Sequence, residues 1–308
     1  MPPIFSMLQT TAELGLINAL VVLSLFLSYT MLGVCDLSTD GCFTLGAVTG
    51  AVVAISGHPY LAIPAAMCAG MLSGLITATL QTRMGVNSLL AGIIVNTGLY
   101  SINLLITNNK AQLNMIKTPT VFTQLRALIG PSPLGIYTTL FIALAAVALV
   151  IVFLSLFLRT RMGLSIRATG NNPDMVRASS IDPRVTTTVG LVISGAITAL
   201  SGCLLAQSQK SVDVNIGSGM VTVALASLLI GGTFAGRGKI PLRAIGAVIG
   251  SLIFQLVYTV ALRLKMPGFM LKLVSAVIVV IAISAPYLRS QFPALKRRFA
   301  HARKRGDC

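Results

Sequence analysis

The stretch GIYTTLFIALAAVALVIVFLSLFL, residues 135–158, contains no charged residue. An α-helix needs about 20 apolar residues to cross the hydrocarbon core of a bilayer. The whole chain is also strongly apolar: 55% of its 308 residues are hydrophobic and only 10% are charged. Soluble domains carry about 25% charged residues. The sequence therefore predicts a membrane protein whose solvent is lipid.

Other uncharged stretches of similar length occur along the chain. We predict an all-α, polytopic membrane protein with about nine spans, at residues 14–34, 40–57, 60–82, 88–108, 135–158, 185–208, 217–235, 241–262 and 268–287. They form one transmembrane domain, residues 1–290, followed by a basic tail, residues 291–308.

The net charge of +16 comes from basic residues between and after the predicted spans. Short loops rich in Lys and Arg remain in the cytoplasm. This rule places the tail, the loop at 236–243 and the loop at 159–184 inside, and alternating passes then place the N-terminus outside. We expect a multi-pass protein of a bacterial plasma membrane, and the distribution of charge argues against nucleic acid as a partner.

The run from Gly231 to Ile240 resembles a phosphate-binding loop but departs from its pattern. That pattern requires a glycine at 233 and a hydroxyl at 240, where this chain has Thr233 and Ile240. The two histidines, His58 and His301, are isolated, and the five cysteines show no metal-ligand spacing. We therefore expect no catalytic, cofactor or metal site in this chain, and any ATP chemistry must belong to another protein.

Residues 36–41, DLSTDG, interrupt two apolar runs. They fit either an ordinary connection at the cytoplasmic surface or a broken second helix whose second half is capped by Ser38 or Asp40. In the second case Ser38 and Thr39 would face a transport pathway.

Two further helices carry polar faces. Asn96, Tyr100 and Asn103 are four and seven residues apart and share one face, and Gln255 and Tyr258 do the same in a later span. Each face either hydrogen-bonds to neighbouring helices or lines the pathway. Glycines four residues apart, at 46 and 50, 70 and 74, and 246 and 250, predict close helix packing, with internal duplication as the alternative.

Between the fifth and sixth spans, residues 167–184 read RATGNNPDMVRASSIDPR. Asn172 is a favourable N-cap, Pro173 suits the first helical position, and Asp174 complements the positive end of a helix. A rigid helix of about two turns is predicted over 173–180, and Asp182 with Pro183 repeats the same start for the next span. We interpret this segment as a docking element for a partner rather than a solvated loop.

Several motifs are similar to those of the permeases of ATP-binding-cassette (ABC) importers in the branched-chain amino acid and ribose group. They are RMGL (161–164), ATGNNP (168–173), RASSID (177–182), VISGA (192–196), GCLLA (202–206), LIGGT (229–233), GAVIG (246–250), DLS (36–38) and LGA (45–47). Within this group the chain most resembles the tryptophan- and tyrosine-type amino acid permeases of Gram-positive bacteria. The usual glycine-rich run after DLS is reduced here to Ser38-Thr39-Asp40-Gly41.

The resemblance implies that the loop at 159–184 carries a coupling helix, which sits in a groove of a cytoplasmic ATPase. The residues implied in coupling are Gly170, Asn171, Asn172, Pro173, Asp174, Met175, Arg177, Ala178 and Ile181. It also implies a homodimer or pseudo-dimer of permeases, an ATPase dimer that binds ATP and Mg²⁺, and an extracellular substrate-binding lipoprotein. The expected cargo is an amino acid, with a sugar or nucleoside as the alternative. A self-sufficient carrier or channel and a membrane enzyme are the competing functions.

Overall fold

The computed structural model describes residues 3–129, 137–235 and 238–263, together with single positions between 273 and 284. Helices form nearly all of this part. Their order is α1 (Pro3–Leu25), the π-helix η1 (Phe26–Met31), α2 (Thr39–Ile55), α3 (Pro59–Thr82), α4 (Ser88–Ile106), α5 (Val121–Ile129), α6 (Thr138–Phe157), α7 (Arg161–Asn171), α8 (Pro173–Ala178), α9 (Pro183–Gln209), α10 (Met220–Ala235) and α11 (Ile240–Arg263). The prediction of an all-α polytopic membrane protein is confirmed.

Eight of the nine predicted spans coincide with helices. Within the described residues, six helices are long and apolar enough to cross a membrane, whereas α2 and α10 are shorter. At 1.5 Å per residue, α2 with its 17 residues covers about 25 Å, less than the roughly 30 Å of a hydrocarbon core. The predicted span at 268–287 lies almost entirely outside the described residues, as does the tail at 291–308.

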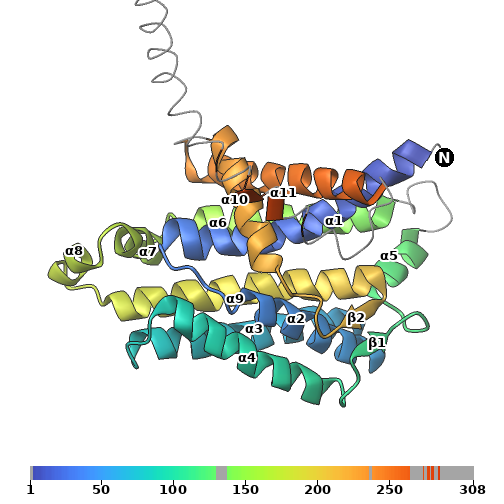
Figure 1. The fold of residues 1–308 in the computed structure, drawn as a ribbon, viewed down its shortest axis with the longest axis horizontal. Coiled ribbons are helices and arrows are strands. Elements are labelled where there is room, and N and C mark those ends of the chain that lie inside the picture. The colour runs from blue at the N-terminus through green and yellow to red at the C-terminus, as the bar shows by residue number, and fades with distance from the viewer. Residues whose placement is uncertain are drawn as a thin grey trace, which may run out of the picture.

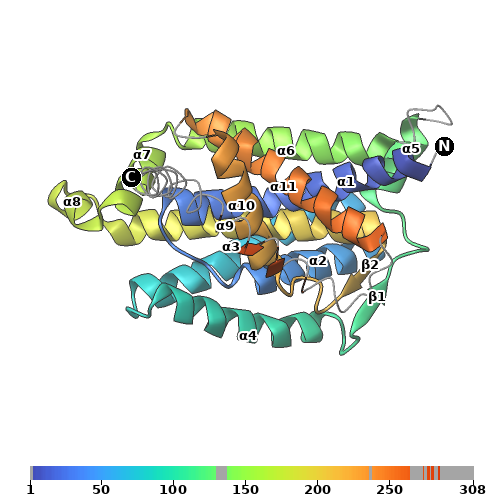
Figure 2. The same cartoon turned by 45° about the horizontal axis from the view of Figure 1, so that its top comes forward.

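Most helices lie roughly along one direction, whereas α10 runs across it (Figure 1). At one end α7 and α8 extend beyond the bundle. At the other lie α5 and a two-stranded antiparallel sheet of β1 (Gln112–Asn114) and β2 (Ser211–Asp213), in which Leu113 pairs with Val212. A second view shows the same separation (Figure 2).

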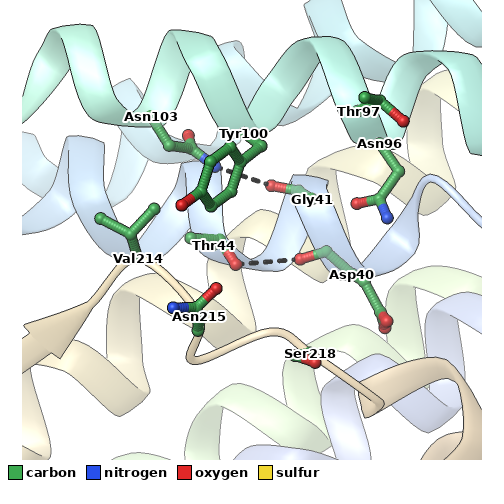
Figure 3. Close-up of a pocket in the computed structure, with 10 residues that line it drawn as sticks. All are labelled: Asp40, Gly41, Thr44, Asn96, Thr97, Tyr100, Asn103, Val214, Asn215 and Ser218. Carbon is green, nitrogen blue, oxygen red and sulfur yellow. Dashed lines mark hydrogen bonds between the residues drawn. The ribbon is translucent and has the colours of Figure 1, made fainter. Parts of the chain in front are cut away.

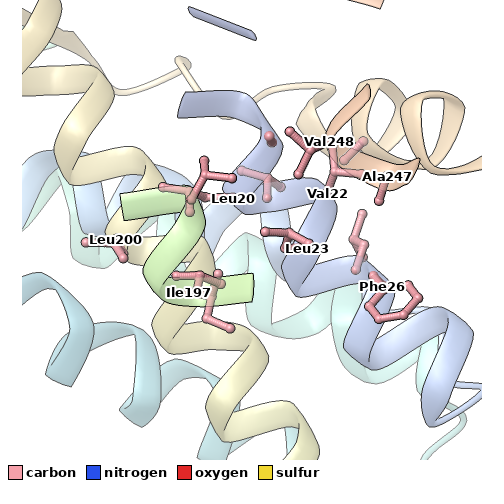
Figure 4. Packing of buried hydrophobic residues seen from close by; sticks show 14 of the residues in the cluster. Leu20, Val22, Leu23, Phe26, Ile197, Leu200, Ala247 and Val248 are labelled. Carbon is pink, nitrogen blue, oxygen red and sulfur yellow. The ribbon is translucent and has the colours of Figure 1, made fainter. Parts of the chain in front are cut away.

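Helix α9 is the centre of the bundle and packs on α1, α2 and α3. In the most apolar window of each helix, 83% of α9 is buried but only 22% of α6. Leu20, Leu23 and Phe26 of α1 and η1 meet Ile197 of α9 and Val248 of α11 in the main apolar cluster (Figure 4). The exposed apolar side chains of α6 therefore belong against lipid.

The glycines spaced four apart lie at points of close helix approach. A Cβ on Gly46 would collide with the backbone of Ala199, and one on Gly70 with the carbonyl oxygen of Gly195. A Cβ on Gly250 would collide with the carbonyl oxygen of Ser227 in the same way. Small residues let helix backbones pack closely where lipid removes the hydrophobic drive. The packing interpretation of these glycines is confirmed.

Residues 32–38 form a non-helical segment between η1 and α2, and much of it is buried. The carboxylate of Asp36 accepts hydrogen bonds from the Ser38 backbone N–H at 2.8 Å and from the Ser38 hydroxyl at 2.6 Å. The segment is therefore a break inside the helical bundle rather than an exposed connection. The prediction that Ser38 or Asp40 caps α2 is wrong, because Ser38 is engaged with Asp36 and makes no side-chain cap bond, while Asp40 bonds elsewhere.

Candidate functional site

The first candidate site is the end of the bundle formed by α7 and α8. Asn172 caps α8, since its side-chain oxygen accepts from the backbone N–H groups of Asp174 and Met175, both at 3.1 Å. Asp182 caps α9 by accepting from the Arg184 N–H at 2.9 Å. Both predicted cap-and-proline starts are confirmed. The helix ends at Ala178, earlier than the predicted residue 180, where Ser180 adopts a left-handed conformation with φ of 61°.

The surface of α8 is exposed along most of its length. Val176 is 1% exposed and anchors the helix, whereas Met175 is 57% exposed and Ile181 is also exposed. The other predicted coupling residues lie on the same exposed segment, with Gly170 half-buried: Asn171, Asn172, Pro173, Asp174, Arg177 and Ala178. The structure thus presents the predicted coupling residues together on one rigid projection.

Helix α7 lies in the segment 159–184, where the sequence predicts a loop, and it connects this projection to the bundle. Thr160 caps it by accepting from the Gly163 N–H at 3.3 Å. The hydroxyl oxygens of Thr169 and Thr186 lie 2.8 Å apart and join α7 to α9. The Gly170 Cα position is so close to the end of η1 that an added Cβ would meet the Met31 carbonyl oxygen. The projection is therefore attached directly to the helix break.

The second candidate site is a polar cavity of about 290 Å³ between α2, α4 and the segment before α10 (Figure 3). It is lined by Asp40, Gly41, Thr44, Asn96, Thr97, Tyr100, Asn103, Val214, Asn215 and Ser218. The three polar residues predicted on α4 all reach this cavity. Two helices and the non-helical segment before α10 line it, and Thr97, Tyr100, Asn215 and Ser218 are exposed, so the cavity opens to the surface of the chain.

Asp40 holds the start of α10 against α2. Its two carboxylate oxygens accept from the backbone N–H groups of Gly219, at 2.9 Å, and Val221, at 2.8 Å. The Thr44 hydroxyl accepts from the Gly217 N–H at 3.2 Å and donates to the Asp40 carbonyl oxygen at 3.0 Å. Asp40 therefore caps a helix about 180 residues away in sequence, and the sequence contained no local signal for this.

The α4 residues differ in their surroundings. Asn103 is 1% exposed, its Nδ2 lies 3.5 Å from the Gly41 carbonyl oxygen, and its Oδ1 has no hydrogen-bond partner. Tyr100 is 48% exposed, so its ring lies at the edge of the cavity. In contrast, Ser38 and Thr39 are buried outside this lining and bond to Asp36. Sequence reasoning missed Asp40, Thr44, Asn215 and Ser218 as lining residues.

Gln255 and Tyr258 line a different cavity, of about 560 Å³, between α1, α10 and α11. The Asn18 side-chain amide donates to the Gln255 Oε1 at 3.3 Å. Ser218 borders both cavities. The two polar faces predicted from sequence thus line different cavities that share Ser218.

Comparisons with known proteins agree with this architecture. Residues 7–283 match the family model described as branched-chain amino acid transport system, permease component. The chain is 31% identical to a tyrosine transport system permease protein of Clostridioides difficile, over 86% of each chain. It is 26% identical to a ribose import permease protein of Escherichia coli, over 91% of this chain and 84% of that one.

Among solved structures, PsaBC from Streptococcus pneumoniae in complex with Fab has a similar fold. The TM-score is 0.52, with 15% sequence identity, and the match covers 92% of this chain and 94% of that chain. At this identity the likeness concerns the fold alone.

Proposed function

Because this chain belongs to the family of branched-chain amino acid transport system permease components, we propose that it forms the translocation pathway of an ABC importer for a small polar solute, an amino acid in the first place. Membership of this family identifies the chain as the membrane subunit of a transporter. The tyrosine permease relative, at 31% identity, supports an amino acid more than the ribose permease, at 26%, supports a sugar.

The observation that carries the proposed mechanism is the exposed, capped α8. A helix of six residues is too short to be stable alone, and here the Asn172 cap and the buried Val176 hold it in shape. Met175 of α8 and Ile181, three residues after its end, are exposed apolar side chains. These properties suit a coupling helix that docks in a groove of a cytoplasmic ATPase dimer. The ATPase dimer binds ATP and Mg²⁺.

In this proposal ATP-driven closure of the ATPase dimer pushes α8, and α7 passes the movement to the break at residues 32–38 through Gly170. Two permease chains, identical or related, enclose the path. An extracellular binding protein delivers the solute and supplies most of the selectivity. The protein lies in the bacterial plasma membrane with α7 and α8 on the cytoplasmic side and the N-terminus outside.

The test is a charge reversal with loss of the helix start, Arg177→Glu with Pro173→Gly. We expect ATP-driven uptake to be abolished while the purified protein keeps its melting temperature and its helical circular dichroism. Lys117→Glu with Pro119→Gly is the matched control, because both residues are exposed at the opposite end of the bundle. It should leave uptake unchanged.

Co-purification supplies the second measurement. An ATPase should purify with the wild-type chain and dissociate from the double variant. Full uptake by this chain alone, in proteoliposomes without ATP, would refute the proposal and support a self-sufficient carrier.

A further inference from the structure

Helix α6 lies at the edge of the bundle and exposes an apolar stripe (Figure 2). The exposed side chains of this stripe recur three or four residues apart and so share one face of the helix: Phe141, Ala145, Leu149, Val152 and Leu156. The 20 residues of α6 cover about 30 Å, which is roughly the thickness of a hydrocarbon core. The stripe therefore faces lipid tails along its whole length, and the turn after α6 lies at the level of the headgroups.

Two arginines stand in this turn. Arg159 continues the stripe, because it follows Leu156 by three residues and its backbone N–H donates to the Leu156 carbonyl oxygen at 3.1 Å. Arg161 comes two residues later, as the first residue of α7. Both side chains are exposed. The positive charge therefore begins where the lipid-facing stripe ends.

The corner between α6 and α7 is held by short contacts. The Thr160 hydroxyl donates to the Phe157 carbonyl oxygen at 2.7 Å and accepts from the Gly163 N–H at 3.3 Å. A Cβ on Gly163 would collide with the Phe157 carbonyl oxygen, so the glycine lets the first turn of α7 fold back on the end of α6. A backbone that is already ordered loses little entropy when it binds a ligand. The two arginines are thus carried by a rigid corner.

The charge of this corner is not balanced by the described residues. The first turn of α7 contains no acidic residue, and neither Arg159 nor Arg161 forms an ion pair with a described carboxylate. Asp174, the nearest acidic residue in the sequence, pairs with Arg177 at 3.4 Å. A phosphate group suits guanidinium groups, because it accepts two parallel N–H bonds from each. The complementary ligand carries a phosphate at one end and apolar chains at the other.

We propose that the corner of Arg159, Thr160 and Arg161 binds the phosphate of an anionic glycerophospholipid, whose acyl chains lie against the stripe of α6. A zwitterionic lipid has the same phosphate, but its own ammonium group competes with the arginines for it. A soluble phosphate ester lacks the chains that the stripe would hold. A cytoplasmic ATPase would meet α8, which projects beyond α7 (Figure 1), rather than a residue that continues a lipid-facing stripe. A lipid bound here stabilises the start of α7, which carries α8.

The experiment uses the full-length chain in detergent and three probes: dioleoyl phosphatidylglycerol, dioleoyl phosphatidylcholine and glycerol 3-phosphate. Native mass spectrometry measures bound lipid, and the melting temperature measures the stabilisation that binding brings. Each arginine near a membrane surface strengthens the binding of anionic lipid about fivefold. Phosphatidylglycerol should therefore bind at least about tenfold more tightly than phosphatidylcholine, and glycerol 3-phosphate should not raise the melting temperature.

Arg159→Gln with Arg161→Gln should weaken phosphatidylglycerol about 25-fold and leave phosphatidylcholine unchanged. Arg159→Lys with Arg161→Lys retains the charge but not the paired N–H geometry, so its affinity should lie between those of wild type and the glutamine variant. The matched control is Lys110→Gln with Lys117→Gln, which removes two exposed basic residues on either side of β1, at the opposite end of the bundle. It should bind phosphatidylglycerol as wild type does.

Equal binding of the two lipids to wild type would overturn the proposal, as would equal stabilisation by glycerol 3-phosphate. The same holds if the lysine control loses as much affinity as the glutamine variant, or if the glutamine variant keeps its lipid and loses a co-purifying ATPase instead. Lipid binding to the chain alone does not involve the ATPase, so failure of the proposed function would appear separately, as the absence of an ATPase that purifies with wild type.

Discussion

Replacement of Asn172 by alanine tests how far α8 depends on its cap. The substitution removes one oxygen that accepts from two backbone N–H groups, those of Asp174 and Met175, at 3.1 Å each. Loss of an N-cap costs about 1 kcal/mol, within a range of roughly 0.5–2. The ion pair between Arg177 and Asp174 cannot compensate, because at 3.4 Å and with side chains 66% and 85% exposed it contributes little.

A loss of about 1 kcal/mol raises the open population of the helix roughly fivefold. Hydrogen exchange followed by mass spectrometry should therefore show about fivefold less protection of the amides at 174–178. ATP-driven uptake should fall only in proportion to the folded population of α8, which changes far less than fivefold as long as most copies of the helix stay folded. The melting temperature of the whole protein should not change, since α8 contributes only Val176 to the buried interior.

A second variant at the same position makes the measurement specific. Asn172→Asp retains the acceptor and should behave as wild type. The reasoning is refuted if Asn172→Ala lowers uptake while the protection of α8 stays at the wild-type value. In that case Asn172 would act by contact with the partner and not through helix stability.

Three further outcomes follow from the packing. Gly46→Leu should prevent accumulation of folded protein, since a side chain there collides with the α9 backbone. Gly98→Ala, where an added Cβ meets nothing within 4 Å, should leave the melting temperature unchanged or raise it slightly. Equal yields of the two variants would contradict this account. Thr198→Val removes a buried hydrogen bond of 2.7 Å to the Ser24 hydroxyl and should cost about 1 kcal/mol in thermal unfolding; no shift in melting temperature would count against it. Gly170→Ala forces the backbone at the helix break to move, because the added Cβ would lie 3.0 Å from the Leu32 Cα. ATP hydrolysis should continue while uptake falls severalfold. Uptake at the wild-type rate would argue against this contact.

The sequence predicted those features that depend on a few neighbouring residues. Asn172 with Pro173, and Asp182 with Pro183, define their helix starts because cap and helix are adjacent in the chain. The long apolar runs likewise located the membrane helices. The sequence predicts a cytoplasmic loop over 159–184 and no helix at α7, although Thr160 at its start is an ordinary cap.

Features that depend on distant segments could not be predicted in this way. The local sequence favours Asp40 as a cap for its own helix, but its carboxylate accepts from the N–H groups of α10. Periodicity predicts an inward face for Asn103 but not that its Oδ1 has no hydrogen-bond partner. The sequence offers Ser38 as a pathway residue, yet its hydroxyl bonds to Asp36. Periodicity indicates which residues share a face and not which segment lies opposite.

The packing of α2 has a consequence for how the protein is made. Its glycine face packs on α9, but α2 ends at Ile55 whereas α9 does not begin until Pro183. At about 5–20 residues per second, the ribosome needs on the order of ten seconds to synthesise the intervening chain. During this time α2 can pack on α3 and α4, which are synthesised before α9, but its glycine face has no partner. Nascent chains that stop before α9 would therefore leave this face uncovered.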